Sequence, residues 1–248
     1  MATTSQVFQA KGRAYRNILA VRRPRRRAGG RSAPLLIGAH YDTVAGSPGA
    51  DDNASALTVL LEAAQRTQDM DLARPLWFVA FCLEEEGLAG SRAFVARLKR
   101  SGRPLAGAII LECVGYAKQE PDSQRIPPGV PIAVPTVGNF LGIVGNDSSR
   151  SLLEAVERSA RRAVPDLKTL PLTVPGAGLS LPDVRRSDHA AFWDESYQAV
   201  MLTDTANFRN PHYHQPTDTI DTLNLDFVEH VLAAVVESIS ELARWPQA

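Results

Sequence analysis

The sequence predicts an α/β protein in which a largely parallel sheet carries helices on both faces. Short apolar segments typical of buried strands alternate along the chain with longer segments whose apolar residues recur at helical spacing. The strand segments are almost wholly apolar, as expected of parallel strands that are covered on both sides. Polar residues come directly after several of them, where the carboxyl ends of parallel strands form a crevice for ligands.

The expected strands are short apolar segments at 35–37, 76–81, 108–111, 141–144 and 199–202. The expected helices lie between and after them, at 54–68, 91–99, 148–163 and 225–243. Residues 116–139 are rich in proline and glycine and show no periodicity, which predicts a long surface excursion. Loops of this length in a compact domain are usually functional.

Length and composition limit the class of protein. The 248 residues fit one domain, 1–248, with residues 1–16 as a short irregular N-terminus. A formal net charge of zero argues against nucleic acid or an anionic membrane as partner, and no stretch approaches the ~18 apolar residues of a membrane helix. The first residues lack the features of a secretion signal. We therefore expect a cytoplasmic location for the chain as given, or a secreted protein if the N-terminus is truncated.

Two smaller features are predicted to be structural. The arginine-rich run at 22–27 is followed by Ala28-Gly29-Gly30, which predicts a solvated hairpin connection. Cys82 and Cys113 are the only cysteines, and we expect both to be buried free thiols.

Residues of types that bind zinc stand just after predicted strands or at turns. They are His40, Asp52, the run Glu84-Glu85-Glu86, Glu112 and His214. Two imidazoles and three carboxylates can hold two zinc ions side by side, and one further carboxylate remains to act as a base. The pattern therefore predicts a metal-dependent enzyme.

Local spacing supports these candidates and leaves alternatives. Asp42 follows His40 by two residues, so on an extended backbone its carboxylate is expected to accept the second imidazole N–H and fix the metal-binding tautomer. Asp52 begins a predicted helix, so N-capping is the alternative to metal binding. The adjacent carboxylates at 84–86 repel one another, which favours a nearby cation over a solvated loop. Strand geometry alone pairs Glu84 with Glu86 on one face.

Several motifs resemble the co-catalytic di-zinc exopeptidases of metallopeptidase family 28, the bacterial and vacuolar zinc aminopeptidases. The resemblance runs from about Asn17 to the C-terminus and rests on residues 38–44, 49–55, 81–91, 111–116, 187–193 and 210–219, with Gly138-Asn139-Phe140 and Val144-Gly145-Asn146. It implies a three-layer αβα fold with a mixed, largely parallel central sheet.

The resemblance also implies a role for each residue of the site. His40 and Glu112 correspond to outer ligands, Asp52 to a carboxylate that bridges both ions, Glu85 to a terminal ligand, and His214, rather than His212, to the last ligand. Glu84 corresponds to the general base, and Tyr213 to a phenol that polarises the scissile carbonyl in some members. The strand must then already turn at Glu84, and the Asp52–Asn53 bond is expected to be cis.

The implied function is that of an aminopeptidase with two Zn²⁺ ions per chain. Its substrate would be a peptide with a free N-terminus, and we expect a monomer. Phe192, Trp193 and Phe208 are expected to wall a crevice near Tyr213 that favours apolar N-terminal side chains. His189 is expected either to support the ligands or the substrate side, or to be structural.

Three alternative functions stay open at the level of sequence. One is a glutaminyl-peptide cyclotransferase with a single zinc ion. Another is a carboxypeptidase-like deacylase, which usually has an inserted domain for which 248 residues leave no room. The third is a catalytically inactive binding module of the same fold.

Overall fold

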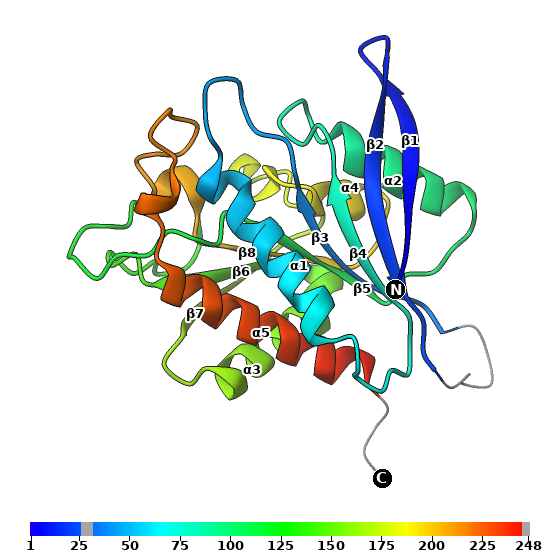
Figure 1. The fold of residues 1–248 in the computed structure, drawn as a ribbon. Helices are drawn as coiled ribbons and strands as arrows, with labels where there is room; N and C mark the ends of the chain where they lie inside the picture. The colour runs from blue at the N-terminus through cyan, green and yellow to red at the C-terminus, as the bar shows by residue number, and fades with distance from the viewer. Residues whose placement is uncertain (26–31, 245–248) are drawn as a thin grey trace.

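The computed structural model describes residues 1–25 and 32–244 and is built around one mixed sheet of eight strands (Figure 1). Along the sheet the strands follow in the order β1-β2-β4-β3-β5-β8-β6-β7. Their bounds are β1 Ala2–Ala10, β2 Arg13–Arg22, β3 Leu35–His40, β4 Leu76–Phe81, β5 Gly107–Glu112, β6 Phe140–Asn146, β7 Lys168–Val174 and β8 Ala199–Thr203.

The centre of the sheet is parallel and its flanks include antiparallel pairs. β3 lies between β4 and β5 and runs parallel to both, and β8 runs parallel to β5. β1 and β2 form a hairpin whose second strand runs antiparallel to β4, and β6 runs antiparallel to β8. Because β3, β4 and β5 are parallel neighbours, their carboxyl ends lie at one edge of the sheet.

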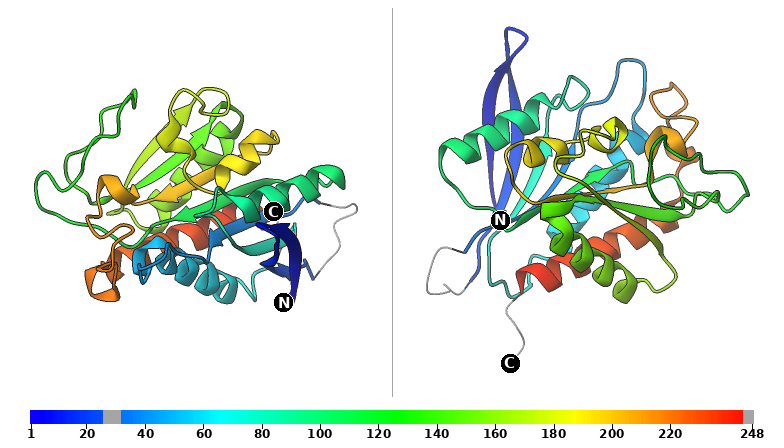
Figure 2. Two further views of the ribbon diagram at one scale, coloured as in Figure 1. Left: turned by 90° about the horizontal axis from the view of Figure 1, so that it is seen from above. Right: turned by 180° about the vertical axis from the view of Figure 1, so that it is seen from behind.

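Alternating side chains of the strands feed two cores, one on each face of the sheet. Within β3, Leu35 and Ile37 join one core, and Leu36 joins the other. The first core lies under α1, α3 and α5, and the second under α2 and α4, on the opposite face (Figures 1 and 2). The helices are α1 Ala56–Arg66, α2 Ala89–Arg100, α3 Arg150–Ala163, α4 His189–Asp194 and α5 Leu225–Ala243. The predicted three-layer αβα fold is confirmed.

The expected strands and helices are all present, with ends shifted by a few residues. Residues 1–16, expected to be irregular, instead form β1 and the first part of β2. The apolar pattern missed β1 because it is an edge strand that buries few side chains, among them Gln6 and Phe8. β7 was missed because Pro171 interrupts it, and an edge strand tolerates proline.

The connecting segments confirm one expectation and correct another. Residues 116–139 contain no regular element, as expected of the predicted excursion. Arg22, the first residue of the arginine run, is not solvated, because it is buried and donates to the Met70 carbonyl. Arg26, Arg27 and the following Ala28-Gly29-Gly30 lie outside the described residues.

Two further expectations concern the cysteines and the membrane. Cys82 and Cys113 are buried free thiols, as expected. Within 1–25 and 32–244, no helix combines the length and the apolar character needed to cross a membrane.

Candidate metal centre

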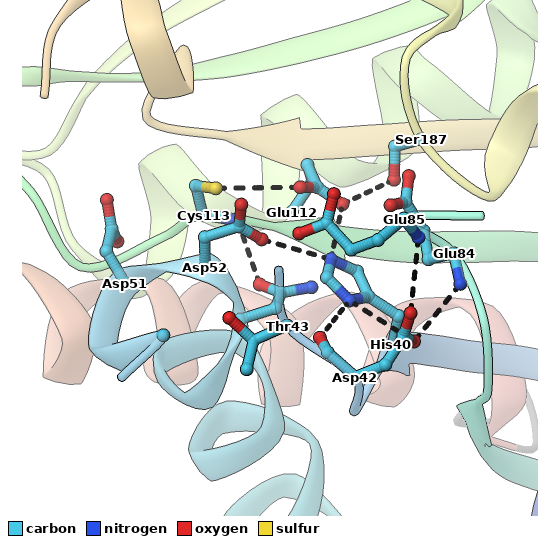
Figure 3. Close-up of polar contacts among 12 residues, drawn as sticks. His40, Asp42, Thr43, Asp51, Asp52, Glu84, Glu85, Glu112, Cys113 and Ser187 are labelled. Carbon is cyan, nitrogen blue, oxygen red and sulfur yellow. Dashed lines mark hydrogen bonds and ion pairs between the residues drawn. The ribbon is translucent and has the colours of Figure 1, made fainter. Parts of the chain in front are cut away.

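The candidate site is assembled at the carboxyl ends of neighbouring parallel strands (Figure 3). His40 is the last residue of β3 and Glu112 the last of β5, while Glu85 follows shortly after β4. Asp52 lies at a kink in the short turn Ala50–Ser55 that precedes α1, where its own backbone is not helical, and His214 lies between β8 and α5. The topology of the sheet therefore brings together residues that are far apart in the sequence.

Two groups of ligand-type side chains share Asp52. In the first, His40 Nε2 lies 3.2 Å from Asp52 Oδ1 and 3.4 Å from Glu112 Oε2. In the second, His214 Nε2 lies 2.9 Å from Asp52 Oδ2 and 3.2 Å from Glu85 Oε1. Each group offers one imidazole nitrogen and two carboxylate oxygens, and the two oxygens of Asp52 face different groups.

These distances fit a metal ion in each group. Ligand atoms at about 2.0–2.2 Å from a tetrahedral zinc ion lie roughly 3.3–3.6 Å from one another. Four buried ligand atoms have no hydrogen-bond partner in the described part of the chain: His40 Nε2, Asp52 Oδ1, Glu85 Oε1 and His214 Nε2. Buried polar atoms rarely lack a partner, so these four atoms indicate a ligand-binding site. The spacing of the atoms and their chemical type, imidazole nitrogen and carboxylate oxygen, both fit zinc.

The charges of the site also call for cations. Burial, with the nearby Glu112 carboxylate, raises the pKa of Glu84 well above its ordinary value. Burial and the charge of Asp52 raise the pKa of Glu85 to about 7. Burial acts in the same direction on Asp52, but its contacts with His214 and His40 prevail and lower its pKa to about 2. Divalent cations beside these carboxylates would offset the repulsion and keep them ionised.

The three consecutive glutamates have different surroundings. Leu83 adopts a left-handed backbone with φ of 60°, so strand alternation no longer applies at Glu84. Glu84 is buried and belongs to neither ligand group, whereas Glu85 joins the second. Glu86 is exposed and pairs with Lys11. The alternation of a regular strand, which pairs Glu84 with Glu86 on one face, therefore does not apply here, and Glu85 rather than Glu86 lies in the second ligand group.

Asp42 supports the site in a different way from the one expected. His40 Nδ1 contacts the backbone carbonyl of Asp42 at 3.0 Å, while the Asp42 carboxylate lies 3.8 Å away. That carboxylate instead accepts the backbone N–H groups of Glu84 and Glu85, at 3.1 and 3.2 Å. A carbonyl accepts only from a protonated Nδ1, so the tautomer that leaves Nε2 free for metal is still favoured.

Other supporting residues could not be identified from local spacing, because their partners are distant in the sequence. Ser187 Oγ donates to Glu112 Oε2 at 2.7 Å. The Asp218 carboxylate accepts the backbone N–H groups of Asp51 and Asp52, at 3.0 and 3.2 Å. Ser187 and Asp218 both lie in motifs that carry the family resemblance, which was the only available signal. The peptide bond after Asp52 is cis, as the resemblance predicts.

Tyr213 lies beside the second ligand group. Its ring stacks on the His214 ring, with centroids 3.8 Å apart. Arg186 Nη2 donates to the Tyr213 hydroxyl at 3.2 Å, and Arg186 Nη1 donates to Asn207 Oδ1 at 2.7 Å. The phenol is thus held at the edge of the site by both stacking and a hydrogen bond.

The remaining candidate histidines lie outside the two ligand groups. His212 Nδ1 lies 2.9 Å from Thr217 Oγ1, which agrees with His214 rather than His212 as the ligand-type residue. His189 is fully buried, and its Nε2 contacts the Val184 carbonyl at 2.7 Å. Its ring meets that of Trp193 edge to face. Of the roles considered for His189, these contacts fit the structural one.

An apolar pocket opens beside the ligand groups. Its empty volume, which includes space open to solvent, is about 810 Å³, and both Glu112 and Tyr213 lie on its lining. Phe208 also lines it, as expected. Phe192 and Trp193 do not, so that part of the prediction is wrong: helix α4 buries both rings in the core under α2 and α4.

The sequence is similar to those of known peptidases. The model of Peptidase family M28 matches residues 17–239. YfbL of Escherichia coli K12, described as an uncharacterized protein, is 34% identical over 248 residues, covering 94% of this chain and 73% of that protein. Leucine aminopeptidase 1 of Arthroderma otae is 28% identical over 230 residues, covering 87% of this chain and 56% of that protein. The chain thus spans little more than half the length of this second relative.

Solved structures share the fold. A zinc aminopeptidase from Bacillus subtilis matches with a TM-score of 0.73 at 24% identity, covering 96% of this chain and 52% of that one. A glutaminyl cyclase from Porphyromonas gingivalis matches with a TM-score of 0.69 at 19% identity, covering 97% and 83%. The match to the family model confirms the expected class of enzyme at the level of a peptidase. By the match over residues 17–239, the chain belongs to peptidase family M28.

Proposed function

We propose that this protein is a zinc-dependent aminopeptidase that hydrolyses the N-terminal peptide bond of peptides. The observation that carries the proposal is the pair of ligand groups that share Asp52. Glu112 belongs both to the first group and to the lining of the apolar pocket. Membership of peptidase family M28 supports the same function.

In this proposal each ligand group binds one zinc ion. His40 and Glu112 would hold the first ion and Glu85 and His214 the second, while Asp52, whose two oxygens face different groups, would belong to both sites. A bound zinc pair supplies a Lewis acid for the scissile carbonyl and lowers the pKa of a water molecule.

Glu84 is the proposed general base. It is 7% exposed and stands outside both ligand groups, and the Asp42 carboxylate holds its backbone N–H at 3.1 Å. The Glu84 carboxylate takes a proton from the attacking water and passes it to the departing amine as the peptide bond breaks. The α-amino group of the substrate binds beside the metal centre, so that only the first peptide bond reaches Glu84.

Tyr213 is the proposed donor to the carbonyl oxygen of the substrate. Because Arg186 donates to the Tyr213 hydroxyl, the phenolic proton remains free to point toward the substrate. Burial raises the pKa of Tyr213, so the phenol keeps this proton at neutral pH. The hydrogen bond strengthens as negative charge develops on the carbonyl oxygen.

We propose that the enzyme acts on its peptide substrates as a monomer.

The principal alternative is a glutaminyl-peptide cyclotransferase with one zinc ion. The likeness in fold to a glutaminyl cyclase favours it, but that likeness concerns the fold alone. The second ligand group argues against it, because Glu85 and His214 then have no metal to bind. The two complete ligand groups, which share the buried carboxylate of Asp52, argue against a catalytically inactive binding module.

A panel of aminoacyl p-nitroanilides, assayed with and without a chelator, tests the proposed function. We expect hydrolysis of substrates with a free amino group, loss of activity with the chelator, and recovery on addition of zinc. N-acetylated versions of the same substrates serve as the control and are expected to be inert. Turnover of the acetylated substrates at equal rate would contradict the aminopeptidase assignment. Cyclisation of an N-terminal glutamine without hydrolysis would favour the cyclotransferase.

A further inference from the structure

The outer wall of the apolar pocket comes from the excursion between β5 and β6. Val130, Ile132 and Val134 all line the pocket. Each is half-buried, while the intervening Pro131 and Ala133 are exposed. This alternation turns one side of the segment toward the pocket. Val130 and Ile132 also pack against the core under α2 and α4.

A single glutamine anchors this wall to the body of the protein. Gln124 is 4% exposed although it lies in a surface excursion. Its Oε1 accepts from Arg209 Nε at 2.9 Å and from Thr205 Oγ1 at 3.1 Å. Its backbone N–H donates to the Thr136 carbonyl at 3.0 Å, which closes the base of the loop that carries the wall. A buried amide with several partners holds a segment firmly, because moving the segment would leave buried donors and acceptors without hydrogen bonds, which costs free energy.

The floor of the pocket contains a glycine where neighbouring positions carry side chains. Phe140, Gly142 and Val144 alternate along β6, and all three line the pocket. A Cβ atom at Gly142 would lie only 3.2 Å from the Thr203 carbonyl oxygen, another lining residue. Because Gly142 has no side chain, the pocket is deeper between Phe140 and Val144, which leaves room for a bulky apolar side chain of the substrate.

We propose that residues 130–134 form the specificity element of the enzyme. Val130, Ile132 and Val134 close the pocket around a bulky apolar N-terminal side chain, such as that of leucine or phenylalanine. Gln124 is a positioning residue that holds this wall in place. The inference rests on the proposed aminopeptidase function, in which the first side chain of the substrate enters the pocket beside Glu112 and Tyr213.

Variants of the zinc-loaded full chain test the wall against matched substrates. For Ile132→Ala we expect kcat/KM to fall roughly tenfold for leucine and phenylalanine p-nitroanilides, through KM, because apolar contact is lost. The alanine substrate does not reach the wall, so its kcat/KM should change by less than about twofold. Gln124→Ala should show the same selective loss. Ile126→Ala is the control, since Ile126 lies in the same excursion but is 58% exposed and is not among the lining residues.

Two outcomes would overturn the proposal. An equal loss for all three substrates, with a lowered melting temperature, would show that the excursion is only structural. Unchanged kinetics in Ile132→Ala would show that substrate does not touch this wall.

Failure of the proposed function can be told apart from failure of the specificity element. If the wild type hydrolyses none of the substrates, binding of free L-phenylalanine and L-alanine is measured by calorimetry with the zinc-loaded protein. A preference for phenylalanine that Ile132→Ala abolishes would keep the pocket assignment while the hydrolytic function is lost. Equal affinities for the two amino acids in the wild type would overturn the specificity element itself.

Discussion

Glu84, Glu85 and Glu86 are chemically identical, and only their surroundings give them different expected effects on mutation. Glu84→Gln removes the proposed base, so turnover should fall by about 10²–10⁴-fold while zinc remains bound. Glu85→Gln removes a charged ligand, so it should weaken one zinc site, and excess zinc should partly restore activity. Glu86 faces Lys11 at the surface, so Glu86→Gln is the matched control. Loss of activity in Glu86→Gln with little change in Glu85→Gln would contradict this arrangement.

The buried imidazole of His189 should make the free energy of unfolding depend on pH. Burial lowers its pKa to about 4, from an ordinary value of 6.5. Between these values the unfolded chain binds a proton that the folded chain does not. The stabilisation is therefore complete above pH 6.5 and is lost as the pH falls toward 4. The shift corresponds to a loss on the order of 3 kcal/mol in the free energy of unfolding.

The measurement for His189 is denaturant unfolding of the wild type and of His189→Gln near neutral pH and in mild acid. Glutamine can still donate to the Val184 carbonyl but does not titrate, so the variant should lose less stability on acidification. Loss of bound zinc in acid affects both proteins alike and cancels in the comparison. The same loss in both proteins would contradict the buried neutral imidazole.

At the scale of elements, the sequence predicts strands that bury apolar side chains on both faces and helices that bury them along one stripe. β4 is wholly apolar and α5 has a clear helical period, so both are evident without a structure. β1 and β7 are not evident in this way, because both are edge strands that bury fewer side chains and because Pro171 interrupts the pattern of β7. The turn at Glu84 depends on the left-handed backbone of Leu83, a residue whose identity gives no sign of it.

The turn that carries Asp52 gives a prediction at this scale. Both oxygens of Asp218 hold backbone N–H groups of this turn, so Asp218→Ala should loosen the ligand that the two groups share. We expect zinc affinity to fall about 10–100-fold, as for other residues that orient ligands. Competition with a chromogenic chelator measures it. Asp221→Ala is the control, because Asp221 is exposed nearby, and an equal effect of both variants would contradict the role of Asp218.

At the scale of the molecule, the order of the motifs and the parallel sheet were enough to predict which residues meet. His40 and Glu112 end two parallel strands and Glu85 follows the third, and ligands of open parallel sheets bind at that edge. The pocket could not be predicted in the same way. Its outer wall comes from an excursion without periodicity, whose position depends on a few buried contacts such as those of Gln124. The sequence predicts Phe192 and Trp193 as walls of the pocket, but both side chains lie in the core.

The zinc content of the purified chain tests the central claim most directly. Elemental analysis after zinc loading and dialysis measures the number of ions per chain without reference to any substrate. Because two complete ligand groups share Asp52, we predict close to two zinc ions per chain. Glu85→Gln should lower this number toward one, since it damages only the second group. A value of one in the wild type, unchanged by added zinc, would contradict the two-ion centre.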